Sequence, residues 1–172
     1  MRTNDPIVVS SGDTEARISP LGCELRSCRV GSRELIWPGD PASWPRSAPV
    51  LFPFCGWLNG GVFRVDGQAY PTNVHGFGPT TAYEVIEAGD GRAVLEMRDS
   101  RETRGKFPFA FVVTVRVTVV PGGVDYAFAV ANPGDVALPY SLGFHPGFIC
   151  PLDGASRADH RIVFERDEIP AF

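Results

Sequence analysis

The stretch that decides the fold class reads FAFVVTVRVTV at residues 109–119. Large apolar residues occupy every second position, and the positions between them include Thr114, Arg116 and Thr118. Successive side chains of a β-strand point to opposite faces, so this period of two predicts a strand with one face in the core. The predicted core face consists of Phe109, Phe111, Val113, Val115, Val117 and Val119.

A second strand follows this one without a long connection. Residues 121–123 read Pro-Gly-Gly, which is typical of a tight turn. The alternation then resumes over residues 124–130, where the apolar face consists of Val124, Tyr126, Phe128 and Val130. Two adjacent strands with large residues on one face predict an antiparallel hairpin in the core of a β-sandwich.

The rest of the chain carries shorter strand patterns separated by turn residues. Further strands are expected at residues 14–19, 24–30, 33–37, 82–88 and 92–98, and Gly89, Asp90 and Gly91 predict a three-residue hairpin connection. No window of twelve or more residues has a helical apolar stripe, and the five prolines of residues 38–53 predict an irregular or extended segment. We therefore expect residues 1–172 to form a single all-β, antiparallel domain with long surface loops.

Composition excludes several classes of function. The 172 residues include 16 Lys and Arg against 20 Asp and Glu, a net charge of −4, and no basic run, which argues against a nucleic-acid partner. The apolar stretches are too short for a signal-peptide core or a membrane-spanning helix. These features predict a cytoplasmic protein without a membrane partner.

The four cysteines offer no metal or redox motif. Cys23, Cys28, Cys55 and Cys150 form no C-x-x-C pair and have no histidine at zinc-finger spacing. Without a secretory signal, disulfides are not expected, and buried free thiols are the favoured interpretation. A metal or redox role stays open as the alternative, but the sequence predicts no metal site and no cofactor.

Two loops combine a histidine with glycine and aromatic residues. The first reads NVHGFG at residues 73–78 around His75, and the second reads YSLGFHPGF at residues 140–148 around His145. This composition suits a shallow sugar site, in which aromatic faces pack on C–H groups and polar side chains bind hydroxyls. Either histidine could instead be a hydrogen-bonded structural residue or a metal ligand, although no H-x-H or H-x-x-x-H motif supplies a second ligand. His160, in a polar run, is expected to be a solvated surface residue.

Several motifs of this sequence resemble, in their order and spacing, those of the aldose 1-epimerase (galactose mutarotase-like) family, especially its LacX-like branch. The resemblance extends from about Gly22 to Leu152. It is carried by residues 22–25, 35–37, 44–53, 66–70, 75–77, 102–103, 107–109 and 143–146.

The resemblance implies a large antiparallel β-sandwich (a supersandwich) with a sugar groove, and an enzyme that interconverts the α and β anomers of an aldose by opening and reclosing the ring. Such a reaction needs a base on the anomeric hydroxyl and an acid on the ring oxygen. By resemblance His145 is the acid, and His75 binds or polarises sugar oxygens; histidine suits both roles because its ordinary pKa of about 6.5 lies near neutrality.

The resemblance also suggests which residues contact the sugar partner. We expect these contacts from Arg46, Trp57, Phe77 and Phe144. Trp57 and the pair Gly78-Pro79 stand where the family commonly carries an arginine, and Arg46 or Arg64 could replace the lost guanidinium groups.

The family's base is a glutamate on a late strand, beyond the matched region, so we expect the chain to correspond to the amino-terminal part of the fold. The carboxylates nearest the matched motifs are Glu24, Glu102, Glu165 and Glu168, and structural or solvated roles are expected for each. A non-catalytic sugar-binding or regulatory module therefore stays open beside the enzyme. Strand edges left exposed by the missing part would favour a homo-oligomer.

Overall fold

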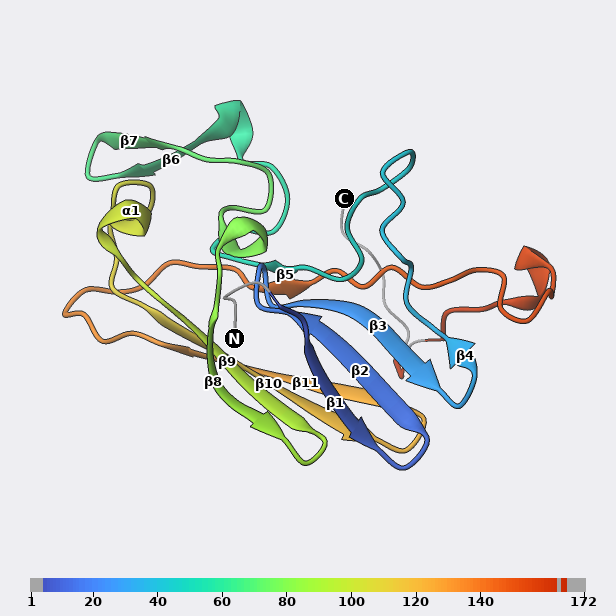
Figure 1. Cartoon of the computed structure of the whole chain (residues 1–172). Coiled ribbons are helices and arrows are strands. Elements are labelled where there is room, and N and C mark those ends of the chain that lie inside the picture. Colours follow the sequence, from blue (N-terminus) through green and yellow to red (C-terminus); the bar gives the residue numbers. More distant parts are fainter. Residues whose placement is uncertain (1–4, 164, 167–172) are drawn as a thin grey trace.

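Two four-stranded antiparallel sheets form the body of the protein in the computed structural model, which describes residues 5–163 and 165–166 (Figure 1). The strands of the first sheet follow chain order: β1 (Ile7–Ser11), β2 (Thr14–Ser19), β3 (Glu24–Val30) and β4 (Arg33–Glu34). The spatial order of the second sheet is β11 (Gly123–Ala131), β10 (Val112–Val120), β9 (Arg92–Arg98) and β8 (Glu84–Gly89). Strands β1 and β2 pack against β10, and β3 packs against β11. The predicted all-β antiparallel sandwich is confirmed.

The apolar face of β10 lies in the core, as its alternation predicts. Val113, Val115 and Val117 are fully buried and belong to one cluster with residues of the first sheet such as Ala16 and Ile18. The predicted face of β11 also points to this core but is only half-buried, because β11 is the edge strand of its sheet. This cluster, which joins both sheets, fixes the loops that leave their ends.

Turn residues account for the strand boundaries. Asp90 and Gly91 connect β8 to β9 with positive φ values of 48° and 72°, so the connection has two residues rather than the predicted three. Gly122, at φ 81°, turns β10 into β11. The strand predicted for residues 33–37 is shorter: β4 ends at Glu34, whose carboxylate accepts the N–H groups of Leu35 and Ile36.

The connections outside the two main sheets contain short strands and single helical turns. Strand β5 (Val50–Leu51) pairs with β12 (Gly143–Phe144), and this pairing makes the end of the proline-rich segment, residues 38–53, extended. Most of the rest of that segment is irregular, as predicted. The remaining elements are the hairpin of β6 (Val62–Val65) and β7 (Gln68–Pro71), α1 (Arg101–Arg104), and the 3-10 turns η1 (Asn59–Gly61), η2 (Gly78–Thr80) and η3 (Arg157–Asp159). No helix in the described part of the chain is long and apolar enough to cross a membrane.

The four cysteines are free thiols, but they are not all buried. Cys23 and Cys28 lie in the core, where burial raises the pKa of each thiol. Cys55 and Cys150 are exposed, so the prediction of buried thiols is wrong for these two. The difference follows from their position, because Cys55 and Cys150 lie in loops outside the two main sheets.

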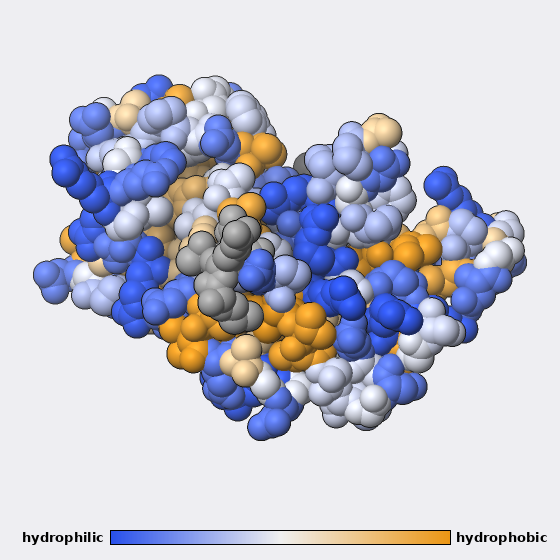
Figure 2. All heavy atoms as spheres, viewed as in Figure 1, coloured by the Kyte–Doolittle hydropathy of each residue, from blue (hydrophilic) through white to orange (hydrophobic). Residues whose placement is uncertain are grey.

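The edge formed by β1 and β8 carries exposed apolar side chains. Val8 is 50% exposed, Val85 37% and Ile86 54%, and every residue of β8 is exposed. Figure 2 shows hydrophobic residues gathered over this part of the molecule. Such an edge is compatible with association of chains, and the homo-oligomer stays a prediction.

Candidate functional site

The pairing of β5 with β12 places His145 beside the proline-rich segment. His145 follows β12 directly, and its N–H donates to the carbonyl of Pro49 at 3.1 Å. Two residues later, the N–H of Gly147 donates to the carbonyl of Ser47 at 2.7 Å. Residues 145–147 therefore run along residues 47–49, and His145 has a fixed backbone position.

His75 is held by both its backbone and its side chain. Its N–H donates to the carbonyl of Gly56 at 2.8 Å, and the N–H of Gly56 donates to Nδ1 of His75 at 2.9 Å. The neutral imidazole that accepts at Nδ1 carries its proton on Nε2. Burial and the neighbouring charge of His145 lower the pKa of His75, which favours this neutral form.

The residue after His75 has to be glycine. Gly76 has φ 70°, and a Cβ at this position would lie 2.5 Å from the carbonyl oxygen of Phe52 and 2.7 Å from Cδ of Pro53. The N–H groups of Phe77 and Gly78 both donate to that same oxygen, at 3.0 and 2.7 Å. The close approach of Gly76 to Phe52 thus holds the loop of residues 73–78 against the residue that follows β5.

The two histidines from distant loops lie side by side. The ring centroids of His75 and His145 are 5.8 Å apart, with an angle of 61° between the ring planes. His145 also packs against the ring of Trp44, with 5.1 Å between centroids. Trp44 was missed as a site residue by the sequence reasoning, although it begins the family-like run of residues 44–53. The roles of the two histidines in proton transfer stay predictions.

A pocket of about 370 Å³ opens in front of these rings. Arg46 lies on its wall, where its Nη2 atom donates to the carbonyl of Pro79 at 2.6 Å. Arg46, one of the two arginines expected to replace the lost guanidinium groups, thus lies beside Pro79. We call this space the histidine pocket; its lining residues are Trp44, Arg46, Pro49, Asn73, Val74, His75, Gly76, Pro79, Thr80 and His145.

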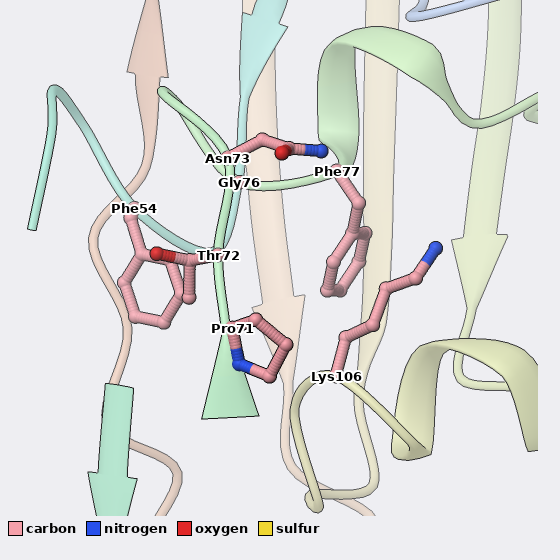
Figure 3. Close-up of a pocket in the computed structure, with 7 residues that line it drawn as sticks. All are labelled: Phe54, Pro71, Thr72, Asn73, Gly76, Phe77 and Lys106. Atoms are coloured by element: carbon pink, nitrogen blue, oxygen red, sulfur yellow. The ribbon is translucent and has the colours of Figure 1, made fainter. Parts of the chain in front are cut away.

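The other predicted sugar contacts lie elsewhere. Phe77 is 7% exposed, packs on Phe52, and lines a second pocket of about 210 Å³ behind the histidine loop. Figure 3 shows this second pocket, with Phe54 on one side and Phe77 and Lys106 on the other. Its lining residues are Phe54, Pro71, Thr72, Asn73, Gly76, Phe77 and Lys106.

Phe144 and Trp57 also lie outside the histidine pocket. The ring of Phe144 stacks on Tyr126 of β11, with 4.5 Å between centroids and an interplanar angle of 16°. Trp57 is 64% exposed. Sugar binding by Phe77, Phe144 and Trp57 stays a prediction, and none of the three lines the wall that carries both histidines.

The carboxylates near the matched motifs have structural surroundings. Glu24 is buried and paired with Arg46, with 3.2 Å between Oε2 and Nη2. Glu102 is solvated and pairs with Lys106, and Glu165 is exposed. Glu168 lies outside the described residues. Among the residues that the structure describes, the lining of the histidine pocket contains no carboxylate.

His160 is not the solvated residue that its polar surroundings predict. Its Nε2 accepts the N–H of Leu152 at 3.1 Å, and its Nδ1 lies 2.9 Å from the carbonyl oxygen of Ser156. The imidazole therefore closes the loop of residues 152–160 and is partly buried. Within residues 5–163 and 165–166, no three His, Cys, Asp or Glu side chains gather in a way that could hold a metal ion.

Comparison with known proteins assigns the family. The model of the aldose 1-epimerase family matches residues 5–170. The chain belongs to the aldose 1-epimerase family. Its curated relatives include the chromosomal protein LacX of Lactococcus lactis subsp. lactis, 28% identical over 156 residues, which cover 86% of this chain and 52% of LacX. Protein YihR of Escherichia coli K12 is 25% identical over 156 residues, which cover 85% of this chain and 51% of YihR.

Solved structures of aldose 1-epimerase relatives have the same fold. A galactose mutarotase related enzyme from Lactobacillus acidophilus superposes with a TM-score of 0.84 at 29% identity, over 88% of this chain and 51% of its own. A galactose mutarotase-like protein from Lactobacillus casei superposes with a TM-score of 0.80 at 32% identity, over 83% and 49%. The chain thus spans about half the length of the relatives it matches.

Proposed function

We propose that this aldose 1-epimerase family member binds an aldose in the histidine pocket and promotes the interconversion of its α and β anomers. The observation that carries this proposal is the pair of imidazoles at 5.8 Å on the wall of a pocket that also exposes Trp44 and Arg46. An indole face suits the C–H groups of a sugar ring, and a guanidinium group donates to several hydroxyl oxygens. A pocket of about 370 Å³ has the size of a small-molecule site.

The two histidines have different roles in this proposal. Two imidazolium ions at this distance would repel each other, and His75 is kept neutral because its Nδ1 accepts the N–H of Gly56. His145 is therefore the imidazole that carries the transferable proton. In the neutral ring of His75, Nε2–H is a donor and neither nitrogen has a free lone pair, so His75 binds a sugar oxygen and does not act as the base.

The proposed reaction then has a defined order. Protonation of the ring oxygen by His145 and loss of the proton from the anomeric hydroxyl break the bond between the anomeric carbon and the ring oxygen. The proton from the anomeric hydroxyl goes to a base that is not among the described residues lining the histidine pocket. The open aldehyde rotates, and the hydroxyl group attacks either face of the carbonyl, while His145 takes its proton back and the base returns the other proton to the carbonyl oxygen.

A second candidate function is sugar binding without turnover. The observation that favours it is the lining of the histidine pocket, where the described residues include no carboxylate to act as the base. A binding module needs the indole, guanidinium and imidazole donors but no base. The two candidates therefore share one site and differ only in whether the bound sugar reacts.

One experiment separates these candidates. Crystalline α-glucose or α-galactose is dissolved in buffer, and the signals of the two anomeric protons are followed by NMR with and without the protein, beside a calorimetric titration. Faster equilibration supports the enzyme, and saturable binding without acceleration supports the binding module. If the protein neither accelerates equilibration nor binds either sugar, both candidate functions are contradicted. A His160→Asn variant is expected to behave like the unaltered protein in both measurements, because His160 lies outside the histidine pocket.

A further inference from the structure

Glu24, the first residue of β3, is a buried carboxylate at the centre of a network of hydrogen bonds. Only 3% of the Glu24 surface is exposed. Oε1 accepts the N–H groups of Ser47 at 2.5 Å and Ala48 at 3.3 Å, and lies 3.3 Å from Nη1 of Arg26. Oε2 lies 3.2 Å from Nη2 of Arg46. One carboxylate thus satisfies two backbone donors and two guanidinium groups.

The network fixes Arg46 from two sides. Its Nη2 atom contacts both Glu24 and the carbonyl oxygen of Pro79, and the side chain is only 26% exposed. Arg46 also lines the histidine pocket, whereas Glu24 does not. Glu24 therefore determines where this guanidinium group lies without contacting the space in front of it.

The same carboxylate also reaches His145 through the backbone. Ser47 and Ala48, which donate to Glu24, belong to the segment whose carbonyl groups accept the N–H groups of His145 and Gly147. Trp44, at the start of this segment, packs on the ring of His145. We refer to residues 44–49 as the strap. The strap connects Glu24 to the indole, the guanidinium and the backbone of His145.

We infer that Glu24 is a positioning residue of the histidine pocket, which holds the strap so that Arg46 and His145 face the same bound sugar. This inference rests on the proposed function, because it assigns a residue that aligns the groups proposed to bind the aldose. Removing the negative charge leaves Arg26 and Arg46 without their shared partner. A Gln amide at this position offers one oxygen in place of two, so either Arg46 or the N–H groups of Ser47 and Ala48 lose their acceptor.

The test compares Glu24→Gln with Glu34→Gln. Glu34 is the matched control, because it is a partly buried carboxylate that also accepts several backbone N–H groups, from Cys28, Leu35 and Ile36, but does not line the histidine pocket. Both variants lose a carboxylate that accepts backbone N–H groups, so both are expected to melt at a lower temperature than the unaltered protein. Glu24→Asp, which keeps the charge, is the second variant if Glu24→Gln does not fold.

Two readouts separate positioning from plain stability. In sugar-free protein, the Hε1 resonance of His145 is expected to shift in Glu24→Gln but not in Glu34→Gln, because the indole beside it moves. With galactose, the dissociation constant is expected to rise about tenfold in Glu24→Gln, as for loss of a charge-assisted contact, and less than twofold in Glu34→Gln. In an Arg46→Ala background, Glu24→Gln is expected to weaken binding much less than in the unaltered protein.

Each other outcome is decisive. An unchanged His145 resonance in Glu24→Gln overturns the inference, as does an equal weakening of binding by Glu24→Gln and Glu34→Gln, or an undiminished effect in the Arg46→Ala background. If the unaltered protein binds neither glucose nor galactose, the proposed function fails, and the sugar-free resonance of His145 still decides whether Glu24 positions the pocket.

Discussion

The N–H of Gly56 donates to Nδ1 of His75 at 2.9 Å, and this contact determines what His75 can do. A protonated imidazole has no lone pair on Nδ1, so the contact exists only while His75 is neutral. The backbone N–H of His75 returns a hydrogen bond to the carbonyl of Gly56 at 2.8 Å. The pair therefore ties the protonation state of His75 to the geometry of the pocket wall.

This tie predicts how stability depends on pH. The pKa of His75 is lower in the folded protein than in the unfolded chain. Below about pH 6.5, the imidazole is therefore protonated in a larger fraction of unfolded than of folded molecules. The stability contributed by neutral His75 is thus present above that pH and is lost as the pH falls through the folded pKa. We expect the melting temperature to fall between pH 7.5 and pH 5.5.

The control for this prediction is His75→Asn. Asparagine tolerates the positive φ of 64° at this position, and its Oδ1 can accept the N–H of Gly56 at any of these pH values. The fall in melting temperature between pH 7.5 and pH 5.5 is expected to be smaller in this variant. An identical fall in both proteins would show that other groups cause it.

Replacing His145 is expected to abolish proton transfer while the sugar still binds. If the protein equilibrates anomers, His145→Asn should lower the rate by roughly 10²–10⁴-fold, the usual contribution of a general acid. The backbone bond from residue 145 to Pro49 is unaffected by the substitution, so the fold should persist. The measurement is the NMR rate of anomer equilibration, and a rate within twofold of the unaltered protein would contradict the role of His145.

Gly76→Ala is expected to destabilise the fold through both strain and a clash. The left-handed conformation and the 2.5 Å approach of the added Cβ to the Phe52 oxygen together predict a loss of about 2–4 kcal/mol. Gly12→Ala is the matched control, because Gly12 has φ 60° and no atom within 4 Å of its Cβ position, so about 1 kcal/mol is expected. Chemical denaturation measures both losses. Equal losses would mean that the contact with Phe52 has no effect.

Trp44 and Trp57 are expected to differ in sugar binding. Trp44 packs on His145 and lines the histidine pocket, whereas Trp57 is 64% exposed and does not. Trp44→Ala should therefore weaken galactose binding by about tenfold or more, the effect of losing one stacked aromatic contact. Trp57→Ala should change the dissociation constant by less than twofold. Calorimetry measures both, and the reverse order would place the sugar outside the histidine pocket.

The strands could be predicted from the sequence because their signal is local. The alternation of residues 109–119 places Val113, Val115 and Val117 on one face, and the structure buries all three. Some boundaries were harder to predict, since they coincide with side-chain hydrogen bonds from outside the strands. For example, Asp99 accepts the N–H of Phe111 at 3.1 Å, and β10 begins only at Val112.

The site could be predicted only in part. Glycine and aromatic neighbours mark the two histidine loops, but the two-residue pairing of β5 with β12 that brings His145 to the proline-rich segment has no local pattern. The sequence predicts that Phe144 contacts the sugar, because aromatic residues of the two histidine loops suit a sugar site. In an extended chain, however, adjacent side chains point to opposite sides, so Phe144 packs on Tyr126 while His145 lines the pocket.

The histidine pocket is tested most directly by the Hε1 resonances of the histidines during a titration with galactose. We predict that the signals of His75 and His145 shift together along one saturable curve, while that of His160 stays in place. Signals of His75 and His145 that do not move at saturating sugar, or that move no more than His160, would contradict the assignment of this pocket as the sugar site.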